Sequence, residues 1–191
     1  MFDDQSIILA SGSPRRQQLL RQAEIAFSLC PSSVKEDFPA SMAPEEVPVF
    51  LAEKKAAAVA AGQPSTSLIL AADTAVLLGD QVLGKPADRS KAVAMLNDLS
   101  GHTHRVITGI CLQKGRRRRS FSVMTRVTFR KLSPFQIAHY VDHYAPFDKA
   151  GAYGIQEWIG LVGIESIEGD YFNVVGLPVA RVVEAISNWV D

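Results

Sequence analysis

Residues 68–74 read LILAADT, an apolar run that ends in an acid and a threonine. The apolar residues do not alternate with polar ones, as expected for a strand that is buried on both faces. Asp73 then falls at the end of this strand, where a carboxylate needs a cation, a metal ion or a hydrogen-bonding loop. A structural cap or turn is the plainer alternative for Asp73, and the sequence favours a functional role.

On both sides of this strand, the pattern alternates between short apolar runs and helical segments. We expect strands at 6–10, 27–30, 105–113 and 120–130, hairpins at 76–83 and 161–175, and helices at 14–22, 44–61, 88–99, 133–144 and 178–189. Strands interleaved with helices and hairpins predict an α/β, mixed α+β fold around a mixed sheet. Because no repeat or low-complexity linker interrupts the chain, we expect residues 1–191 to form a single domain.

The charge balance argues against several classes of protein. Twenty basic and twenty acidic residues cancel, so no bulk field draws the chain to nucleic acid or to a membrane surface. No apolar run is long enough to span a membrane, and residues 1–4 carry acids where a secretory signal needs cations. We therefore expect a cytoplasmic protein, in which Cys30 and Cys111 are free, buried thiols.

A candidate anion site lies between the first strand and the first helix. Residues 11–16 read SGSPRR, so small residues expose backbone N–H groups where the positive end of the helix dipole also points. Arg15 and Arg16 add planar forks that suit phosphate oxygens. An ordinary capped helix with two solvated arginines explains the same residues equally well.

Two carboxylates and three lysines are further candidates. Mg²⁺ prefers one or two carboxylates together with substrate phosphates, which makes Asp73 and Glu36 possible ligands, although Glu36 alone reads as a surface acid. Lys85 follows a predicted hairpin and is held between glycine and proline, whereas Lys55 could decorate an exposed helical face. Either of these lysines, or Lys54 beside Lys55, could neutralise phosphate charge, although solvated lysines are far commoner.

Two other segments bear on ligand choice. Residues 148–156 read DKAGAYGIQ, a glycine-rich loop whose backbone could approach a base while Gln156 reads its polar edge. Residues 116–119 are four arginines at a hairpin tip, which favours a solvated turn over a nucleic-acid surface because no aromatic residues interleave with them. His102 and His104 lack the further ligands of a zinc site.

Five motifs, in this order along the chain, resemble Maf-like proteins. They read ASGSPRR, ADT, GKP, DKAGAYGIQ and GDYFNVVGLP at residues 10–16, 72–74, 84–86, 148–156 and 169–178. The resemblance implies an elongated two-lobed fold around a mixed twisted sheet, similar to inosine triphosphate pyrophosphatases, with the site in a central cleft. It also implies a homodimer that uses Mg²⁺ or Mn²⁺ to convert dTTP and UTP into the monophosphate and pyrophosphate, in a role that cleans the nucleotide pool.

The same resemblance implies roles for individual residues. Asp73 would be catalytic and would hold the metal with Glu36; the phosphates would be held by Ser13, Arg16, Lys55 and Lys85, and specificity would rest on Arg15, Thr74 and Gln156. The sequence departs from the common pattern after Gln156, where Glu157 and Trp158 replace a more glycine-rich continuation.

Three other functions are open at this stage. A nucleotide-binding regulator of cell division would bind dTTP without cleaving it. A 7-methyl-GTP pyrophosphatase would share the chemistry but not the base, and it resembles this chain less at the three specificity positions. A nucleic-acid-binding module would depend on the four arginines and on low salt.

Overall fold

The polypeptide is described from residue 6 to residue 189 in a computed structural model, and it divides into two units. Unit 1 comprises residues 6–74, 108–123 and 176–189 of the described chain, and unit 2 comprises residues 75–107 and 124–175. Residues 1–4, which bear on the expected absence of a secretory signal, lie outside the described residues. Within those residues, every helix is too short or too polar to cross a membrane.

The strands form one mixed sheet. They are β1 (Ile7–Leu9), β2 (Ser28–Leu29), β3 (Leu68–Leu78), β4 (Gln81–Leu83), β5 (Thr103–Lys114), β6 (Arg117–Phe129) and β7 (Ile164–Glu168). Their order is β2-β1-β3-β5-β6-β7, with β4 on β3. The β1 strand is parallel to β2 and to β3, whereas the β3–β4 and β6–β7 pairs are antiparallel. The expected mixed α/β fold is therefore confirmed, and β3, β5 and β6 contribute residues to both units.

Seven α-helices and two short 3₁₀ helices lie between and after these strands in the described chain. The α-helices are α1 (Pro14–Gln22), α2 (Val47–Ala60), α3 (Arg89–Leu99), α4 (Pro134–Tyr144), α5 (Trp158–Gly163), α6 (Tyr171–Val175) and α7 (Val179–Ser187). Two short 3₁₀ turns, η1 (Pro146–Asp148) and η2 (Ala150–Ala152), follow α4. The Ser133 hydroxyl accepts a hydrogen bond from the Gln136 N–H, and the Gln136 side-chain carbonyl accepts one from the Ser133 N–H, so the capping box that the sequence predicted at the start of α4 is confirmed.

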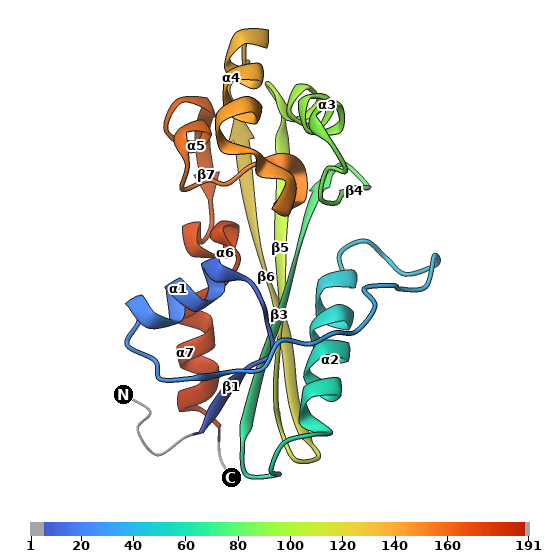
Figure 1. The fold of residues 1–191 in the computed structure, drawn as a ribbon, viewed down its shortest axis with the longest axis vertical. Coiled ribbons are helices and arrows are strands. Elements are labelled where there is room, and N and C mark those ends of the chain that lie inside the picture. The colour runs from blue at the N-terminus through green and yellow to red at the C-terminus, as the bar shows by residue number, and fades with distance from the viewer. Residues whose placement is uncertain (1–5, 190–191) are drawn as a thin grey trace. The chain divides into compact units, whose positions relative to one another are not determined.

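In unit 1 the parallel strands are buried on both faces. Ile8 and Ile69 pack with Ala52, Ala56 and Val59 in one apolar cluster, so α2 covers one face of β1 and β3. Ile7, Leu9, Leu68 and Leu70 alternate with those strand residues and are also buried. Figure 1 shows α1 and α7 on the side of these strands opposite α2. Burial on both faces explains why residues 68–72 are apolar without alternation.

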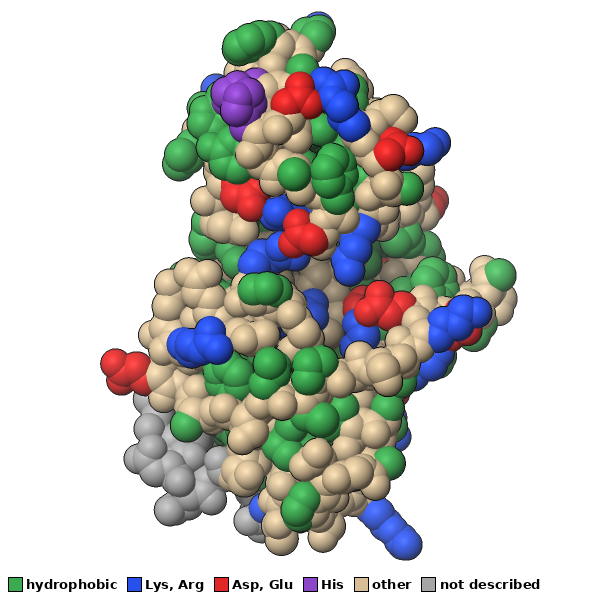
Figure 2. Space-filling model, viewed as in Figure 1, with side chains coloured by type: hydrophobic (Ala, Val, Ile, Leu, Met, Phe, Trp, Pro, Cys, Tyr) green, Lys and Arg blue, Asp and Glu red, His purple; other side chains and the backbone are tan. Residues whose placement is uncertain are grey.

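In unit 2 the core gathers around α3, α4 and the ends of the long strands. Leu96, Val127 and Phe129 belong to one cluster with Ile137 and Tyr140 from α4. The opposite side of α4 carries stacked rings, in which His139 lies between Phe135 and His143. Figure 2 shows histidine side chains in purple at the upper left of the face in view. The helix is therefore amphipathic, and Tyr140 lies on its buried face.

The expected end of the central strand before Asp73 is wrong. The strand β3 continues without a break to Leu78, and Val76–Leu78 pair with β4. Asp73 and Thr74 are half-buried between buried residues on either side. The error arose because two polar residues inside a buried strand look like its end, and only tertiary partners can make their burial tolerable.

The expected hairpin at 161–175 is also wrong in most of its length. Residues 158–163 form α5, residues 164–168 form β7, and residues 171–175 form α6. Asp170 accepts hydrogen bonds from the N–H groups of Phe172 and Asn173 at 2.7 and 3.3 Å, which caps α6. The Gly169-Asp170 pair thus starts a helix and does not turn a hairpin.

Replacing Gly109 by alanine should destabilise unit 1. A Cβ atom at Gly109 would lie 2.2–2.4 Å from backbone atoms of Pro48 and Val49. These atoms belong to the first turn of α2, so they cannot move aside as the end of a flexible side chain could. We expect Gly109→Ala to lower the free energy of unfolding by about 3 kcal/mol or more, measured by urea denaturation. The matched control is Gly62→Ala, whose Cβ would meet its nearest atom at 3.9 Å. Equal stabilities of the two variants would contradict this packing.

Stability should fall in acid through His104. Its ring is buried beside Phe129, with Nε2 2.7 Å from the Tyr153 hydroxyl, and burial lowers its pKa from 6.5 to about 4. Between those pH values the unfolded chain binds a proton that the folded chain refuses, so stability is lost as pH falls, by about 3 kcal/mol in total.

The measurement is the free energy of unfolding at pH 7.5, 5.5 and 4.5. The His104→Gln variant should lose the part of the pH dependence that His104 causes. The control His102→Gln changes an exposed residue and should keep it. A pH slope that is identical in His104→Gln and in the native chain would rule the assignment out.

Candidate active site

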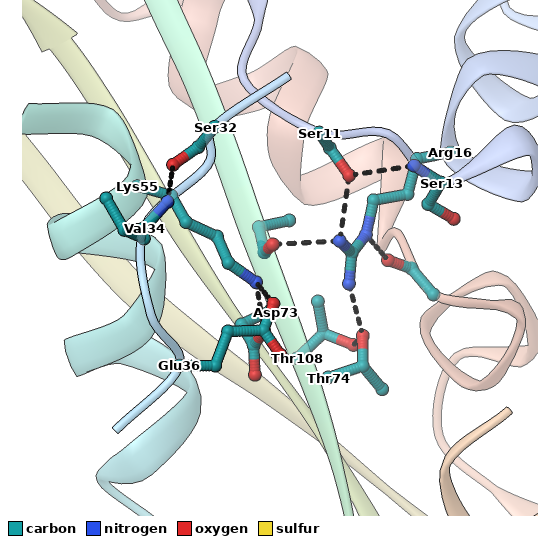
Figure 3. Close-up of polar contacts among 12 residues, drawn as sticks. Ser11, Ser13, Arg16, Ser32, Val34, Glu36, Lys55, Asp73, Thr74 and Thr108 are labelled. Carbon is teal, nitrogen blue, oxygen red and sulfur yellow. Dashed lines mark hydrogen bonds and ion pairs between the residues drawn. The ribbon is translucent and has the colours of Figure 1, made fainter. Parts of the chain in front are cut away.

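Asp73 lies at the centre of a charged cluster in unit 1. The Lys55 ammonium lies 2.6 Å from Asp73 Oδ1 and 2.6 Å from Glu36 Oε1, as Figure 3 shows. The side chains of Lys55 and Asp73 are only 11% and 13% exposed, whereas that of Glu36 is 53% exposed. One cation thus bridges a buried carboxylate and a solvent-facing one.

Helical periodicity explains why Lys55 reaches the sheet. Ala52, Ala56 and Val59 pack on the strands, and Lys55 lies three residues after the first and four before the last of them. These spacings place it on the same face of α2. Its neighbour Lys54 points elsewhere and pairs with Asp37.

Glu36 comes from the polar loop that precedes α2. In this loop the Ser32 hydroxyl accepts a hydrogen bond from the Val34 N–H at 3.3 Å (Figure 3). The local bond bends the chain two residues before Glu36. Glu36 and Asp73, which lie far apart in sequence, therefore share one lysine.

Arg16 ties the first helix to the central strand. It donates to the Ala72 carbonyl at 2.8 Å, to the Thr74 hydroxyl at 3.0 Å and to the Ser11 hydroxyl at 3.0 Å (Figure 3). A fourth hydrogen bond, at 2.9 Å, goes to the Gly176 carbonyl. Arg16 is only 9% exposed, so these acceptors replace the water that its guanidinium loses.

The start of α1 leaves other polar groups near Arg16. Ser13 is the N-cap and Pro14 the first helical residue, as predicted, but the Ser13 side chain makes no capping hydrogen bond. Instead, the Ser13 N–H donates to the Ser11 hydroxyl at 3.3 Å. Arg15, the next residue of the helix, is half-buried.

Burial perturbs both charges on the strand. Desolvation raises the pKa of Asp73 above its usual value, and the positive charges of Lys55 and Arg16 act against this rise. Desolvation likewise lowers the pKa of Arg16, while Asp73 opposes that change. Asp73 is therefore a stronger base than an exposed aspartate, held beside two fixed cations.

Two predicted site residues belong to unit 2. Lys85 is exposed in the loop after β4, and the carbonyl of the preceding Gly84 accepts a hydrogen bond from the Gly151 N–H at 3.1 Å. Gln156 is exposed at the end of the glycine-rich loop that contains Gly151. Unit 2 thus brings the loops of Lys85 and Gln156 together.

The donor set of this cluster suits a hard divalent cation. Glu36 and Asp73 both offer carboxylate oxygens to one position that already attracts the Lys55 ammonium. Among the described residues, no group of three or more His, Cys, Asp or Glu side chains could hold a metal ion. Two carboxylates completed by substrate phosphates match the usual coordination of Mg²⁺.

Sequence reasoning missed two contributors. The Thr108 hydroxyl lies 3.0 Å from the Thr74 hydroxyl, and the Gly176 carbonyl accepts a hydrogen bond from Arg16. A lone threonine in an apolar strand gives no local signal of such a role. Gly176 lies inside the motif at 169–178, but it contributes through its backbone carbonyl, which accepts a hydrogen bond from Arg16. A contribution from the backbone cannot be predicted from the chemistry of a side chain.

Replacing Arg16 by lysine should weaken the fold itself. A lysine ammonium has three donors at one point and cannot reach the acceptors that the planar guanidinium joins. We expect Arg16→Lys to cost about 3 kcal/mol of unfolding free energy without nucleotide or metal, because buried acceptors lose their partner.

The control is Arg21→Lys on the same helix. Arg21 is exposed and donates one hydrogen bond to Gln17 at 3.3 Å, so this change should cost less than about 0.5 kcal/mol. Arg16→Lys with native stability would show that the four hydrogen bonds do not support the fold.

The chain is similar to known proteins over nearly all of its length. The "dTTP/UTP pyrophosphatase" of Cytophaga hutchinsonii is 48% identical over 95% of this chain and 83% of its own length. The "dTTP/UTP pyrophosphatase" of Parabacteroides distasonis is 44% identical over 96% of this chain and 95% of its own length. A solved HAM1 protein from Coxiella burnetii shares the fold, with a TM-score of 0.51, 16% identity and coverage of 97% of this chain and 100% of that one. The family model of the Maf-like protein matches residues 6–189, and the chain belongs to this family.

Proposed function

We propose that this protein hydrolyses dTTP and UTP to the nucleoside monophosphate and pyrophosphate. Two relatives named for this activity are 44–48% identical to it over nearly the whole chain. The observation that carries the proposal is the buried Asp73 carboxylate, which Lys55 links to the exposed Glu36. Such a cluster offers a base, a cation and a metal ligand at one place.

The reaction needs a base that takes a proton from the attacking water. Asp73 takes a proton from a water molecule as the water oxygen forms a bond to the α-phosphorus, and the bond to the bridging oxygen breaks so that pyrophosphate leaves. Desolvation raises the pKa of Asp73 in the metal-free protein, and a bound cation would act against this rise, as Lys55 and Arg16 do.

We include Mg²⁺ or Mn²⁺ in the proposal, with Glu36 and Asp73 as its protein ligands. The ion would neutralise charge on the phosphate oxygens as the transition state forms. Lys55 holds the two carboxylates together at 2.6 Å from each, so it keeps their mutual repulsion low before the ion binds.

The phosphates would be held by Ser13, Arg16, Lys55 and Lys85. The Ser13 hydroxyl and the N–H groups at the start of α1 suit phosphate oxygens. Arg16 donates four hydrogen bonds to protein groups, so its main contribution to phosphate binding would be its charge. Lys85 would contribute a mobile ammonium from its exposed loop.

We propose that pyrimidine preference rests on Arg15, Thr74 and Gln156. Gln156 exposes one donor and one acceptor, which can pair with the polar edge of uracil or thymine. Thr74 is held by Arg16 and Thr108, so it presents a fixed surface. If 7-methyl-GTP were cleaved with a higher kcat/KM than dTTP, this assignment would be wrong.

A cytoplasmic location and a homodimer, both expected from the sequence, complete the proposal. Neither is needed for the chemistry of Asp73. Light scattering at micromolar concentration tests the dimer, and a single-subunit mass would exclude it. The four arginines at 116–119 are given no role in nucleic-acid binding, since Arg118 pairs with Glu53 at 3.0 Å and Arg117 lies over Trp189.

The decisive variant is Asp73→Asn. It keeps the shape of the side chain but removes the base and a metal ligand, so kcat for dTTP should fall by about 1,000-fold or more. The measurement is pyrophosphate release from dTTP with Mg²⁺ or Mn²⁺, together with a thermal unfolding curve for each protein.

The control is Asp80→Asn in the exposed turn between β3 and β4, which should keep native activity. If Asp73→Asn hydrolyses dTTP at the native rate, Asp73 is not the base. If the native chain binds dTTP but releases no pyrophosphate with either metal, it is a regulator and the proposed reaction is wrong.

A further inference from the structure

The loop that carries Gln156 has an unusual backbone. Gly151 has φ +70°, and the next residue, Ala152, has φ +58°. A left-handed conformation costs a residue such as alanine roughly 1–2 kcal/mol, so it persists only where neighbouring contacts impose it. The loop of residues 148–157 therefore needs anchors.

Tyr140 supplies one anchor from the buried face of α4. Its hydroxyl accepts a hydrogen bond from the Gly154 N–H at 2.9 Å and donates one to Glu157 Oε2. Tyr140 is fully buried, and burial together with the Glu157 carboxylate raises the pKa of this phenol. The hydroxyl therefore keeps its proton and joins both ends of the Gly154–Glu157 turn.

Lys149 supplies a second anchor at the other end of the loop. Its ammonium lies 3.2 Å from Glu157 Oε1 and 2.7 Å from Asp148 Oδ1, and the residue is 8% exposed. A lysine buried this far needs such partners. Each oxygen of Glu157 thus has its own partner, Tyr140 on one side and Lys149 on the other.

The Gln156 amide and the Glu157 carboxylate both lie beside Gly154. A Cβ atom built on Gly154 would lie 2.9 Å from Glu157 Cδ and 3.1 Å from Gln156 Nε2, so both side chains cross the bare face of this glycine. Gln156 is exposed and lies inside the turn that the Glu157 N–H closes on the Gly154 carbonyl and that Tyr140 holds at both ends. Release of Glu157 from Tyr140 and Lys149 would loosen the turn that carries Gln156.

From these contacts we infer that Glu157, held by Tyr140 and Lys149, is a positioning residue that orients Gln156 for selection of the nucleotide base. The inference rests on the proposed function, since it concerns base selection at the same site. It assigns a role to the residue at which the sequence departs from the common family pattern. Because Glu157 acts through Gln156 and is given no role in holding phosphates, we expect it to affect nucleotide binding and not bond cleavage.

The experiment compares Glu157→Gln and Tyr140→Phe with the native chain. Each variant keeps the size of its side chain while removing the charge that Lys149 meets or the hydroxyl that joins Gly154 to Glu157. Kinetic constants for dTTP, UTP, CTP and GTP are measured with Mg²⁺. KM for dTTP should rise about tenfold and kcat should stay within about twofold, so that the preference for dTTP over GTP falls about tenfold.

Two controls match these changes. Glu165→Gln changes an exposed carboxylate of β7. Tyr144→Phe removes a hydroxyl from an exposed ring that stacks on Tyr140. Both control variants should keep the native kinetic constants. Thermal unfolding of each variant separates a fold defect from a binding defect.

The outcomes separate the two claims. If the native chain does not cleave dTTP, the proposed function fails whatever the variants do. If the native chain cleaves dTTP but Glu157→Gln and Tyr140→Phe keep native KM and base preference, the inference is overturned. A fall in kcat and melting temperature with unchanged base preference also overturns it, because Glu157 would then be purely structural.

Discussion

A carboxylate buried inside a β-strand is the constraint on which unit 1 depends. Asp73 and Thr74 interrupt an apolar strand that is covered on both faces, and neither could stay there without partners. Lys55 arrives from α2 and Arg16 from α1, so the residues that satisfy β3 also set the positions of both helices. The polar residues that interrupt the apolar strand are therefore the same residues that form the candidate site.

The same cluster is suited to polyphosphate chemistry for an electrostatic reason. Desolvation makes Asp73 more basic, while Lys55 and Arg16 supply positive charge that water cannot screen as well as it does at the surface. Glu36 stays exposed, so its carboxylate can change partners when a cation enters. Unit 2 follows a comparable rule, because the buried Lys149 and Tyr140 hold a strained loop through one carboxylate.

Much of the fold could be predicted because local signals were strong. The bounds of α1 and the capping box of α4 follow from serine, proline and glutamine at fixed positions. Local patterns failed where tertiary contacts overrule them. The strand β3 passes through Asp73 because of distant cations, and residues 171–175 are helical because Asp170 caps them.

The site was predictable only in part, for similar reasons. The family resemblance implied roles for Glu36, Lys55 and Arg16, and the structure brings these residues around Asp73 in unit 1. Spacing alone could not separate Lys55 from Lys54, since an alanine-rich helix has no clear apolar face. Glu157 was visible only as a departure from a pattern, because its partner Tyr140 comes from another helix.

The most direct measurement of the central claim is the fate of the water oxygen. The native protein is incubated with dTTP and Mg²⁺ in ¹⁸O-labelled water, and the products are examined by mass spectrometry. Attack at the α-phosphorus predicts label in dTMP and unlabelled pyrophosphate in equal amount. Label in pyrophosphate, or the formation of dTDP and inorganic phosphate, would contradict the account.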